Sequence, residues 1–279
     1  MTRYIVVASP KGGVGRTTLV AQLSTRLSAS GVRCLAVDLD PQNALALHLG
    51  SPARWVSMPQ PSPASLAQTV GIVNQELNPQ ALMEYLKARR AAVAYIPFGA
   101  HNAFSRRHAE EALANDGAAL RARVDGLLPP RCEVVLFDTP AGHNGWAEAV
   151  LPVADLVLVP LLAEPACLAT VPAYEVYLQA HAGRAYPKQV KYVVNRWNPA
   201  QQLACDAFSV LCDSLGERVW SRCVFDDEHV REALAKNEPH MQDPGSQAEA
   251  DFEQIARFAR DWLADAAGAA VTSAEARAS

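Results

Sequence analysis

The residues whose types and spacing most clearly indicate chemistry form a glycine-rich segment near the start of the chain, Ser9-Pro10-Lys11-Gly12-Gly13-Val14-Gly15-Arg16-Thr17-Thr18. The segment lies between a short apolar run and a helical pattern, which is the context of a phosphate-binding loop. Its glycines let successive backbone N–H groups face phosphate oxygens, and the N-terminus of the following helix adds a positive dipole end. The Thr17 hydroxyl is a suitable Mg²⁺ ligand. A glycine-rich turn that binds no ligand is the weaker alternative, because so many positions of the segment match those of a phosphate-binding loop in the right context.

Acidic residues follow two of the apolar runs further along the chain. Asp38 and Asp40 come after the run Cys34–Val37, and Asp138 comes directly after Val134–Phe137. Carboxylates at the carboxyl ends of parallel strands lie at the ligand-binding edge of a sheet. Together with the two cations of the glycine-rich segment, they provide what Mg-ATP requires. Either aspartate of the first pair could instead cap the N-terminus of a helix.

These residues need a framework of alternating strands and helices, and the sequence predicts one. Short β-branched runs predict strands at Tyr4–Ala8, Cys34–Val37, Val93–Ile96, Val134–Phe137, Leu156–Pro160, Lys191–Val194 and Val219–Val224. Helices are predicted at Thr17–Ser30, Pro79–Arg90, Arg106–Leu128, Leu168–Ala182, Gln201–Leu215, His229–Lys236 and Gln247–Ala267. This alternation indicates a single α/β domain over residues 1–267, with a mostly parallel sheet covered by helices on both faces. We expect residues 268–279 to form a flexible tail and the Pro- and Ser-rich residues 52–63 to form an irregular excursion.

The composition limits the possible classes of function. The chain has 279 residues, of which 50% are hydrophobic and 7% aromatic, and its formal net charge is −4. The apolar content excludes a disordered chain, and the slight negative charge disfavours a protein that coats nucleic acid with its whole surface. The six cysteines form no Cys-x-x-Cys pair, which disfavours a cysteine metal centre and a disulfide framework. No apolar run is long enough to span a membrane, so we expect a soluble, cytoplasmic protein without membrane insertion.

The glycine-rich segment resembles the deviant Walker A motif, KGGVGKTT, of the ParA/MinD superfamily of P-loop ATPases, also called the SIMIBI class. The resemblance implies the P-loop fold of this class, with ATP and Mg²⁺ as cofactors and a homodimer that holds ATP between its protomers. Lys11 takes the place of the signature lysine, which acts on the partner's phosphates across that dimer. The residues that the resemblance assigns to the nucleotide are Lys11, Gly12, Gly13, Val14, Gly15, Arg16, Thr17 and Thr18.

The same resemblance assigns roles to residues at the ends of the predicted strands. Asp40 is expected to position or activate the attacking water, and Asp38 to help organise the Mg²⁺ shell. Asp138 takes the Walker B position and is expected to hold Mg²⁺ through water. Gly142, in the segment that follows Asp138, is expected to be a hinge that responds to the γ-phosphate. Asn195 is the candidate for adenine recognition, and a loop-capping asparagine is an alternative of comparable weight.

Arg16 departs from the superfamily pattern. It stands where these ATPases have a lysine that contacts the β- and γ-phosphates. Arginine keeps the charge, but its side chain is longer, planar and forked, so the exchange is not conservative. Backbone amides and Mg²⁺ supply much of nucleotide binding, whereas hydrolysis depends on exact placement of charge. The sequence therefore predicts a slow ATPase or an ATP-binding switch.

Four further segments are similar to segments of the bacterial cellulose-biosynthesis protein BcsQ family, in the same order along the chain: 96–99 (IPFG), 161–170 (LLAEPACLAT), 225–235 (FDDEHVREALA) and 246–251 (SQAEAD). Each segment alone could be an ordinary turn or amphipathic helix. This family also varies at the Walker lysine. The resemblance implies an accessory and regulatory role in cellulose synthesis and export. The implied partners are cellulose synthase subunits and a small accessory protein, with attachment to the inner membrane or cell pole through them.

A ParA-type partition or protein-positioning ATPase is the main alternative. Such proteins bind DNA through basic residues on their late helices, but the helix predicted at Gln201–Leu215 contains no Lys or Arg, so nucleic acid is not an expected partner. A MinD-type membrane ATPase would end in a basic amphipathic helix, and residues 268–279 carry a single arginine. A metal-reducing or nitrogenase-like relative would need paired cysteines near the Asp138 segment, and the sequence has none there.

Overall fold

The computed structural model describes residues 2–50, 71–73, 77–88, 93–99, 107, 111, 116–236 and 245–278. The predicted irregular excursion at residues 52–63 lies outside this set. Most of the first part of the helix predicted at Arg106–Leu128 also lies outside it, as do Arg89 and Arg90 at the end of an earlier predicted helix.

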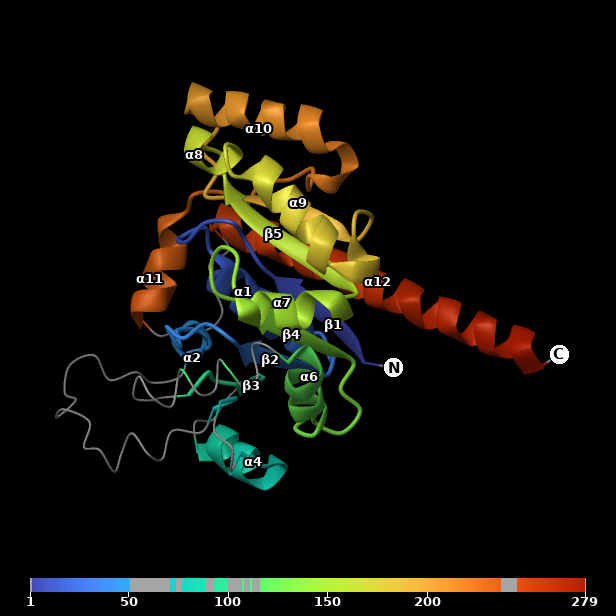
Figure 1. Ribbon diagram of the computed structural model, residues 1–279. Helices are drawn as coiled ribbons and strands as arrows, with labels where there is room; N and C mark the ends of the chain where they lie inside the picture. The colour runs from blue at the N-terminus through green and yellow to red at the C-terminus, as the bar shows by residue number, and fades with distance from the viewer. Residues whose placement is uncertain are drawn as a thin grey trace.

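Six parallel strands form the central sheet (Figure 1). They are β1 Arg3–Val7, β2 Cys34–Asp38, β3 Ala94–Ile96, β4 Val134–Asp138, β5 Leu156–Leu162 and β6 Val190–Asn195. Their order across the sheet is β3-β2-β4-β1-β5-β6, and each neighbouring pair is parallel. Every residue of β2 and β4 is buried, as expected for parallel strands that are covered on both faces and rich in Val, Leu and Phe.

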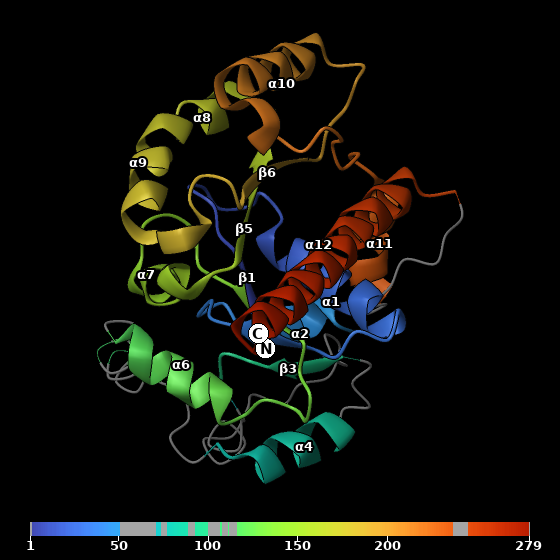
Figure 2. The ribbon, with the colours of Figure 1, turned by 90° about the vertical axis from the view of Figure 1, so that its right-hand side faces the viewer.

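Helices cover both faces of this sheet, as Figure 2 shows. The helices α1 (Arg16–Ala29), α11 (Glu228–Lys236) and α12 (Gln247–Ala278) lie on one face, and α7 (Gly145–Val150) and α9 (Val171–His181) lie on the other. The predicted α/β fold, with a mostly parallel sheet between helices, is confirmed. The remaining helices are α2 Leu45–His48, α4 Pro79–Ala88, α6 Gly117–Asp125, α8 Pro165–Leu168 and α10 Gln202–Leu215, with short 3₁₀ turns at Leu151–Val153, Gly183–Ala185 and Gly216–Arg218.

Three predicted elements differ in the structure. Val219–Val224 is not a strand, because it meets β6 at separate points without a continuous ladder: an isolated bridge joins Val219 to Tyr192, and the Val224 N–H donates to the Val194 carbonyl at 2.8 Å. The helix predicted at Leu168–Ala182 begins three residues later, as α9 at Val171, after the separate short helix α8 that ends at Leu168; Pro172 stands in the first turn of α9, where a missing N–H costs nothing. The last helix continues to Ala278 instead of ending near Ala267, because alanine, the strongest helix former, dominates this stretch.

The docking of α12 on α1 fixes the helix that begins at the phosphate-binding segment. Arg26 of α1 is 2% exposed, and its guanidinium pairs with Glu253 of α12 at 3.7 Å and lies 5.8 Å from the ring centre of Phe252. A cation over an aromatic face and beside a carboxylate is stabilised even where water is excluded.

Within the described residues, no helix combines the length and the apolar character that crossing a membrane requires.

Candidate functional site

The carboxyl ends of the six parallel strands lie at one edge of the sheet, and the predicted site residues gather there. Asp38 and Asp138 are paired in register between β2 and β4, and Val7, which precedes the glycine-rich segment, is also opposite Asp138. Asn195 ends β6 opposite Leu162 of β5. The predicted convergence at this edge is therefore confirmed, and the chemistry of the site can be examined residue by residue.

The phosphate loop, residues 9–18, has the backbone that its glycines allow. Gly13 and Gly15 have φ angles of 73° and 92°, a region that favours glycine, and Gly15 is the N-cap of α1. A β-carbon on Gly15 would clash with the side-chain amide of Asn195, so a residue other than glycine here would also have to displace that amide from its hydrogen bond with Val14. Gly12 and Gly13 are exposed. The loop thus leads directly into a helix N-terminus, as a phosphate site requires.

Asp138 is completely buried, and neither of its carboxylate oxygens has a hydrogen-bond partner among the described residues. Burial raises the pKa of Asp138 to about 7, while the Thr17 hydroxyl and the Arg16 guanidinium oppose this shift. Thr17 is thus close to Asp138 but makes no hydrogen bond of normal geometry with it. Unpartnered carboxylate oxygens beside a threonine hydroxyl are hard oxygen donors of the kind that Mg²⁺ prefers, so these residues fit that ion.

The protein supplies only part of a metal shell at this position. No cluster of three or more His, Cys, Asp or Glu residues in the described part of the chain could hold a metal ion on its own. This is the usual situation for Mg²⁺ in nucleotide sites, where water and phosphate oxygens complete the octahedral shell. Asp138 and Thr17 could therefore supply only some of the ligands of a Mg²⁺ ion.

Asp38 has a different environment from Asp138. Its two carboxylate oxygens accept hydrogen bonds from the backbone N–H groups of Asp40, at 2.9 Å, and Leu45, at 3.0 Å. It therefore holds the turn after β2 and the start of α2, which is the capping role considered as an alternative for this residue. Burial, followed by the nearby charge of Asp138, raises the pKa of Asp38 well above its usual range. A role in the Mg²⁺ shell stays a prediction.

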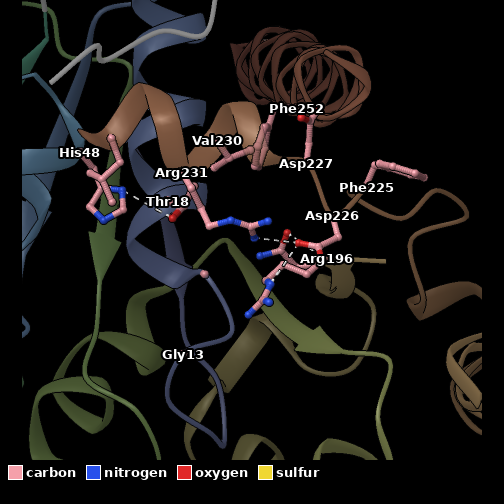
Figure 3. Close-up of a pocket in the computed structure, with 13 residues that line it drawn as sticks. Gly13, Thr18, His48, Arg196, Phe225, Asp226, Asp227, Val230, Arg231 and Phe252 are labelled. Atoms are coloured by element: carbon pink, nitrogen blue, oxygen red, sulfur yellow. Dashed lines mark hydrogen bonds and ion pairs between the residues drawn. The ribbon is translucent and has the colours of Figure 1, made fainter. Parts of the chain in front are cut away.

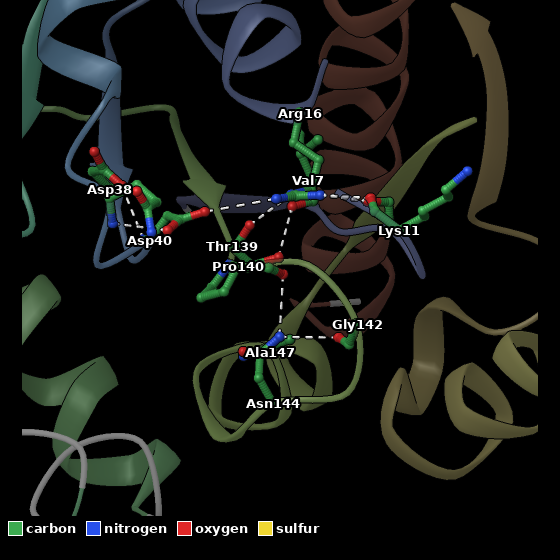
Figure 4. A network of polar contacts seen from close by, with 12 residues as sticks. Val7, Lys11, Arg16, Asp38, Asp40, Thr139, Pro140, Gly142, Asn144 and Ala147 are labelled. Atoms are coloured by element: carbon green, nitrogen blue, oxygen red, sulfur yellow. Dashed lines mark hydrogen bonds and ion pairs between the residues drawn. The ribbon is translucent and has the colours of Figure 1, made fainter. Parts of the chain in front are cut away.

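Arg16 does not extend toward solvent but folds back under the phosphate loop, and it is 8% exposed (Figure 4). Its Nε donates to the Thr139 carbonyl at 2.8 Å, and one terminal nitrogen donates to the Ser9 hydroxyl at 2.8 Å and the Lys11 carbonyl at 2.9 Å. The other terminal nitrogen lies 3.6 Å from a carboxylate oxygen of Asp40. The guanidinium thus joins segments that follow three different strands.

Lys11 has a partner within its own chain. Its ammonium lies 2.6 Å from a carboxylate oxygen of Glu164, which follows β5, and both side chains are 40% exposed. The hydrogen bond between them raises the pKa of Lys11 and lowers that of Glu164. An ion pair this exposed contributes little to stability and can be exchanged for another partner. The predicted action of Lys11 across a dimer stays a prediction.

The segment after β4 is tied by hydrogen bonds to the end of β1 and to the phosphate loop, and Figure 4 shows part of this network. The Gly142 N–H donates to the Ser9 carbonyl at 2.9 Å, and Gly142 has a φ of 73°. The Thr139 hydroxyl donates to the Val7 carbonyl at 2.9 Å. Asn144 donates to the Gly142 carbonyl and caps α7 by accepting from the Ala147 N–H at 2.9 Å. A ligand that moves the phosphate loop would therefore also move this segment, as a hinge at Gly142 would require.

A cavity of about 220 Å³ opens beside the phosphate loop (Figure 3). Its lining includes Thr18, His48, Asn195, Arg196, Phe225, Asp226, Asp227, Val230, Arg231 and Phe252. Asn195 lines the cavity, but its amide nitrogen donates to the Val14 carbonyl at 2.8 Å and its oxygen accepts from the Arg196 N–H at 3.0 Å. These contacts match the loop-capping alternative for Asn195, and adenine recognition stays a prediction.

Charged residues at the mouth of this cavity pair with one another. One carboxylate oxygen of Asp226 lies 3.3 Å from the Arg196 guanidinium and 3.1 Å from that of Arg231. On the opposite side, His48 lies 3.5 Å from the Thr18 hydroxyl, and burial lowers the pKa of His48 to about 4. The cavity therefore has a neutral imidazole on one wall and a shared carboxylate between two arginines on the other.

Several of these residues were not assigned a site role from the sequence. Glu164 and Asp226 belong to segments that drew attention only for their family resemblance, and Lys11 and Arg196, which pair with them, are far away in the chain. Ser9 lies in the phosphate loop, but nothing in its position indicated a contact with Arg16. His48 gave no signal, because a lone histidine near the end of a short apolar stretch is ordinary.

Comparison with known proteins agrees with this fold. The sequence model of the family "Cellulose biosynthesis protein BcsQ" matches residues 2–259. The carbon monoxide dehydrogenase accessory protein CooC of Rhodospirillum rubrum is 27% identical over 169 residues, and the septum site-determining protein MinD of Escherichia coli K12 is 30% identical over 160 residues. These matches cover 55% and 57% of this chain, but only 61% and 52% of the two relatives.

A solved structure shows the same fold. The crystal structure of cobyrinic acid a,c-diamide synthase from Mycobacterium smegmatis, which contains an ATP analogue and magnesium, has a TM-score of 0.66 and 21% identity to this chain. The similarity covers 94% of this chain and 96% of the synthase. The strand order, the phosphate loop and the family match all agree, and the chain belongs to the family of cellulose biosynthesis protein BcsQ, a branch of the ParA/MinD-type P-loop ATPases.

Proposed function

We propose that this chain binds ATP together with Mg²⁺ at the carboxyl edge of its sheet, forms a homodimer across the nucleotide, and regulates bacterial cellulose biosynthesis and export. Family membership and the MinD-like relatives support a regulatory P-loop ATPase. Its partners would be subunits of the cellulose synthase complex and a small accessory protein. It would act in the cytoplasm and reach the inner membrane or cell pole through those partners.

The observation that carries the proposal is the buried carboxylate of Asp138, which lies close to Thr17 of the phosphate loop and has no hydrogen-bond partner among the described residues. A buried carboxylate without a partner is costly, so a protein retains one where a ligand completes it. A divalent cation carried by a triphosphate would complete this group. The structure of the cobyrinic acid a,c-diamide synthase, with its ATP analogue and magnesium, supports the same pairing of ligands.

Each group of the site has a distinct task in this proposal. The exposed backbone of Gly12 and Gly13 and the N-terminus of α1 bind the phosphates, while Asp138 and Thr17 hold Mg²⁺. Mg²⁺ neutralises charge on the phosphate oxygens when it is bound. Asp40 orients the attacking water. Because Arg16 already donates to protein oxygens, it offers little further stabilisation to a developing charge, and hydrolysis is expected to be slow.

Dimerisation is expected to depend on ATP, because a ligand that binds only the dimer stabilises it by mass action. Lys11 would leave Glu164 and contact the partner's phosphates. Sedimentation of the purified protein with Mg-ATP and with Mg-ADP tests this directly. Lys11→Ala should weaken the ATP-dependent dimer at least tenfold while changing ATP binding less than threefold, whereas the exposed control Lys236→Ala should change neither. Equal monomer fractions for wild type and Lys11→Ala at saturating ATP would contradict the role across the dimer.

A partition-type positioning ATPase would differ in its DNA binding. We expect no ATP-dependent retention of double-stranded DNA, since α10 carries no Lys or Arg. Retention that requires ATP and falls with salt would favour the partition-type function over the cellulose-linked one.

A further inference from the structure

Arg16 is the most completely engaged side chain at the carboxyl edge of the sheet. We propose that Arg16 is a positioning residue: without nucleotide it crosslinks the phosphate loop to Asp40 and to Thr139, and the phosphates of ATP must displace Asp40 from it. This inference rests on the proposed ATP site. It goes beyond that site by naming the intramolecular contact with which the nucleotide competes.

The geometry gives Arg16 contacts on three segments at once. The loop after β1 provides the Ser9 hydroxyl and the Lys11 carbonyl, at 2.8 and 2.9 Å from one terminal nitrogen. The segment after β4 provides the Thr139 carbonyl, at 2.8 Å from Nε. The turn after β2 provides Asp40, at 3.6 Å from the second terminal nitrogen. Figure 4 shows the guanidinium between these groups, with Asp40 on one side and the Lys11 backbone on the other.

A lysine at this position could not reproduce the crosslink. A guanidinium spreads five N–H donors over a rigid fork, whereas an ammonium has three donors at one point. The acceptors of Arg16 surround all three of its nitrogens, so one compact ammonium would have to abandon some of them. The structure thus gives arginine a task here that the lysine typical of the superfamily could perform only in part.

The charges around Arg16 show why Asp40 is the contact that ATP would break. The Thr139, Ser9 and Lys11 contacts are hydrogen bonds to neutral oxygens, but Asp40 is held at ion-pair distance and is 14% exposed. A triphosphate carries several negative charges and competes directly with a single carboxylate for the same cation.

The consequence is a link between occupancy and the position of Asp40. In the structure, the carboxylate expected to orient water is restrained beside Arg16. With phosphate present, it is released. Asp40 therefore leaves Arg16 when nucleotide binds. The free energy of the Arg16–Asp40 pair is lost in this exchange, so it reduces the affinity for ATP.

Two substitutions and their combination test this inference by two readouts. The first readout is the Tm of the nucleotide-free protein, and the second is the Kd for Mg-ATP measured by calorimetry. Arg16→Lys should lower the nucleotide-free Tm by about 3 to 8 °C, because buried contacts are lost, while ATP binds at least as tightly as to wild type. Arg33→Lys is the matched control, since Arg33 forms an exposed ion pair with Glu133, and its Tm should change by less than about 1 °C.

Asp40→Asn should tighten ATP binding by about 3- to 10-fold, because it removes the competing carboxylate. The gain should be clearly smaller when Arg16 is already replaced by lysine. A gain of equal size in both backgrounds would show only the removal of a negative charge and would overturn the inference. So would an Arg16→Lys protein that keeps the wild-type Tm or binds ATP more weakly.

The two parts of the account fail in different ways. If neither wild type nor any variant binds ATP, the proposed function is refuted, and with it the displacement of Asp40. The Tm comparison of Arg16→Lys with Arg33→Lys still decides whether Arg16 crosslinks the empty site. If Arg16→Lys does not fold, Asp40→Asn alone carries the test, and a Kd that is unchanged or weaker overturns the inference.

Discussion

Replacing Asp138 with asparagine should stabilise the nucleotide-free protein at neutral pH while removing its response to Mg²⁺. Asp138 is fully buried, neither of its carboxylate oxygens has a hydrogen-bond partner in the described part of the chain, and its pKa is raised from 3.8 to about 7. The folded protein therefore holds this proton more tightly than the unfolded chain does. Between about pH 4 and pH 7 the folded state binds more protons, so this group makes stability fall as the pH rises.

The size of the effect follows from the shift. A shift of about three pKa units corresponds to a penalty of about 4 kcal/mol once the pH is well above 7, since each unit is worth about 1.4 kcal/mol. At pH 5.5 about half of this penalty is already present, so about 2 kcal/mol more develops between pH 5.5 and pH 8. The asparagine amide is also left unpartnered, at a cost of about 1 to 3 kcal/mol that does not depend on pH. The decisive quantity is therefore how the difference in the free energy of unfolding between Asp138→Asn and wild type changes with pH.

The assay is urea unfolding of wild type and Asp138→Asn at pH 5.5 and pH 8, without nucleotide or divalent cation. The free energy of unfolding of the variant, relative to wild type, should rise by about 2 kcal/mol between the two pH values. Asp213→Asn, at an exposed position on α10, is the control and should show no such change. A difference between Asp138→Asn and wild type that stays constant or falls as the pH rises would refute the reasoning.

Three other predictions follow from single contacts. Glu164→Gln removes the carboxylate that pairs with the lysine of the phosphate loop; stability measured by urea unfolding should change by less than about 1 kcal/mol, and the ATP-dependent dimer should tighten when followed by sedimentation. His48→Asn should reduce the loss of stability between pH 7 and pH 4.5, measured by urea unfolding, by about 2 to 3 kcal/mol. The reason is that the folded state keeps His48 neutral down to about pH 4, while the unfolded chain binds a proton near pH 6.5. The same loss of stability in the variant and in wild type over this pH range would contradict this prediction. Gly15→Ala should lower the free energy of unfolding by about 2 to 4 kcal/mol, because Gly15 combines a φ of 92° with a clash for an added β-carbon. The control Gly31→Ala, where φ is 88° and the surrounding space is open, should lower it by about 1 kcal/mol. Equal losses in the two variants would contradict the clash at Gly15.

The framework of the fold was largely predictable from the sequence, because its signals are local. Six of the strands were predicted within two residues at each end, since their apolar runs are bounded by turns and helical patterns. The prediction of a strand at Val219–Val224 is wrong, because a β-branched run shows only that a strand is possible. Pairing with the rest of the sheet decides whether the strand forms. The end of α12 depended on whether a run of alanines outweighs one glycine, which propensities alone do not settle.

The candidate site was predictable in its location but not in its contacts. Strand ends and glycines brought Asp38, Asp40, Asp138 and the phosphate loop to one edge, as the topology of a parallel sheet requires. Nothing local showed that Asp38 would hold backbone N–H groups while Asp138 stays unpartnered, because the two aspartates have similar sequence contexts. The partners of Arg16 lie up to 123 residues away, so its role emerges only from the folded chain.

The most direct test of the account is calorimetric titration of the purified protein with ATP, with and without Mg²⁺, in parallel with Asp138→Asn. We predict saturable binding at one site per chain, with affinity that increases at least tenfold in the presence of Mg²⁺ for wild type and by less than twofold for Asp138→Asn. Absence of ATP binding by wild type at millimolar nucleotide, or an undiminished effect of Mg²⁺ on Asp138→Asn, would contradict the assignment of this sheet edge as a Mg-ATP site.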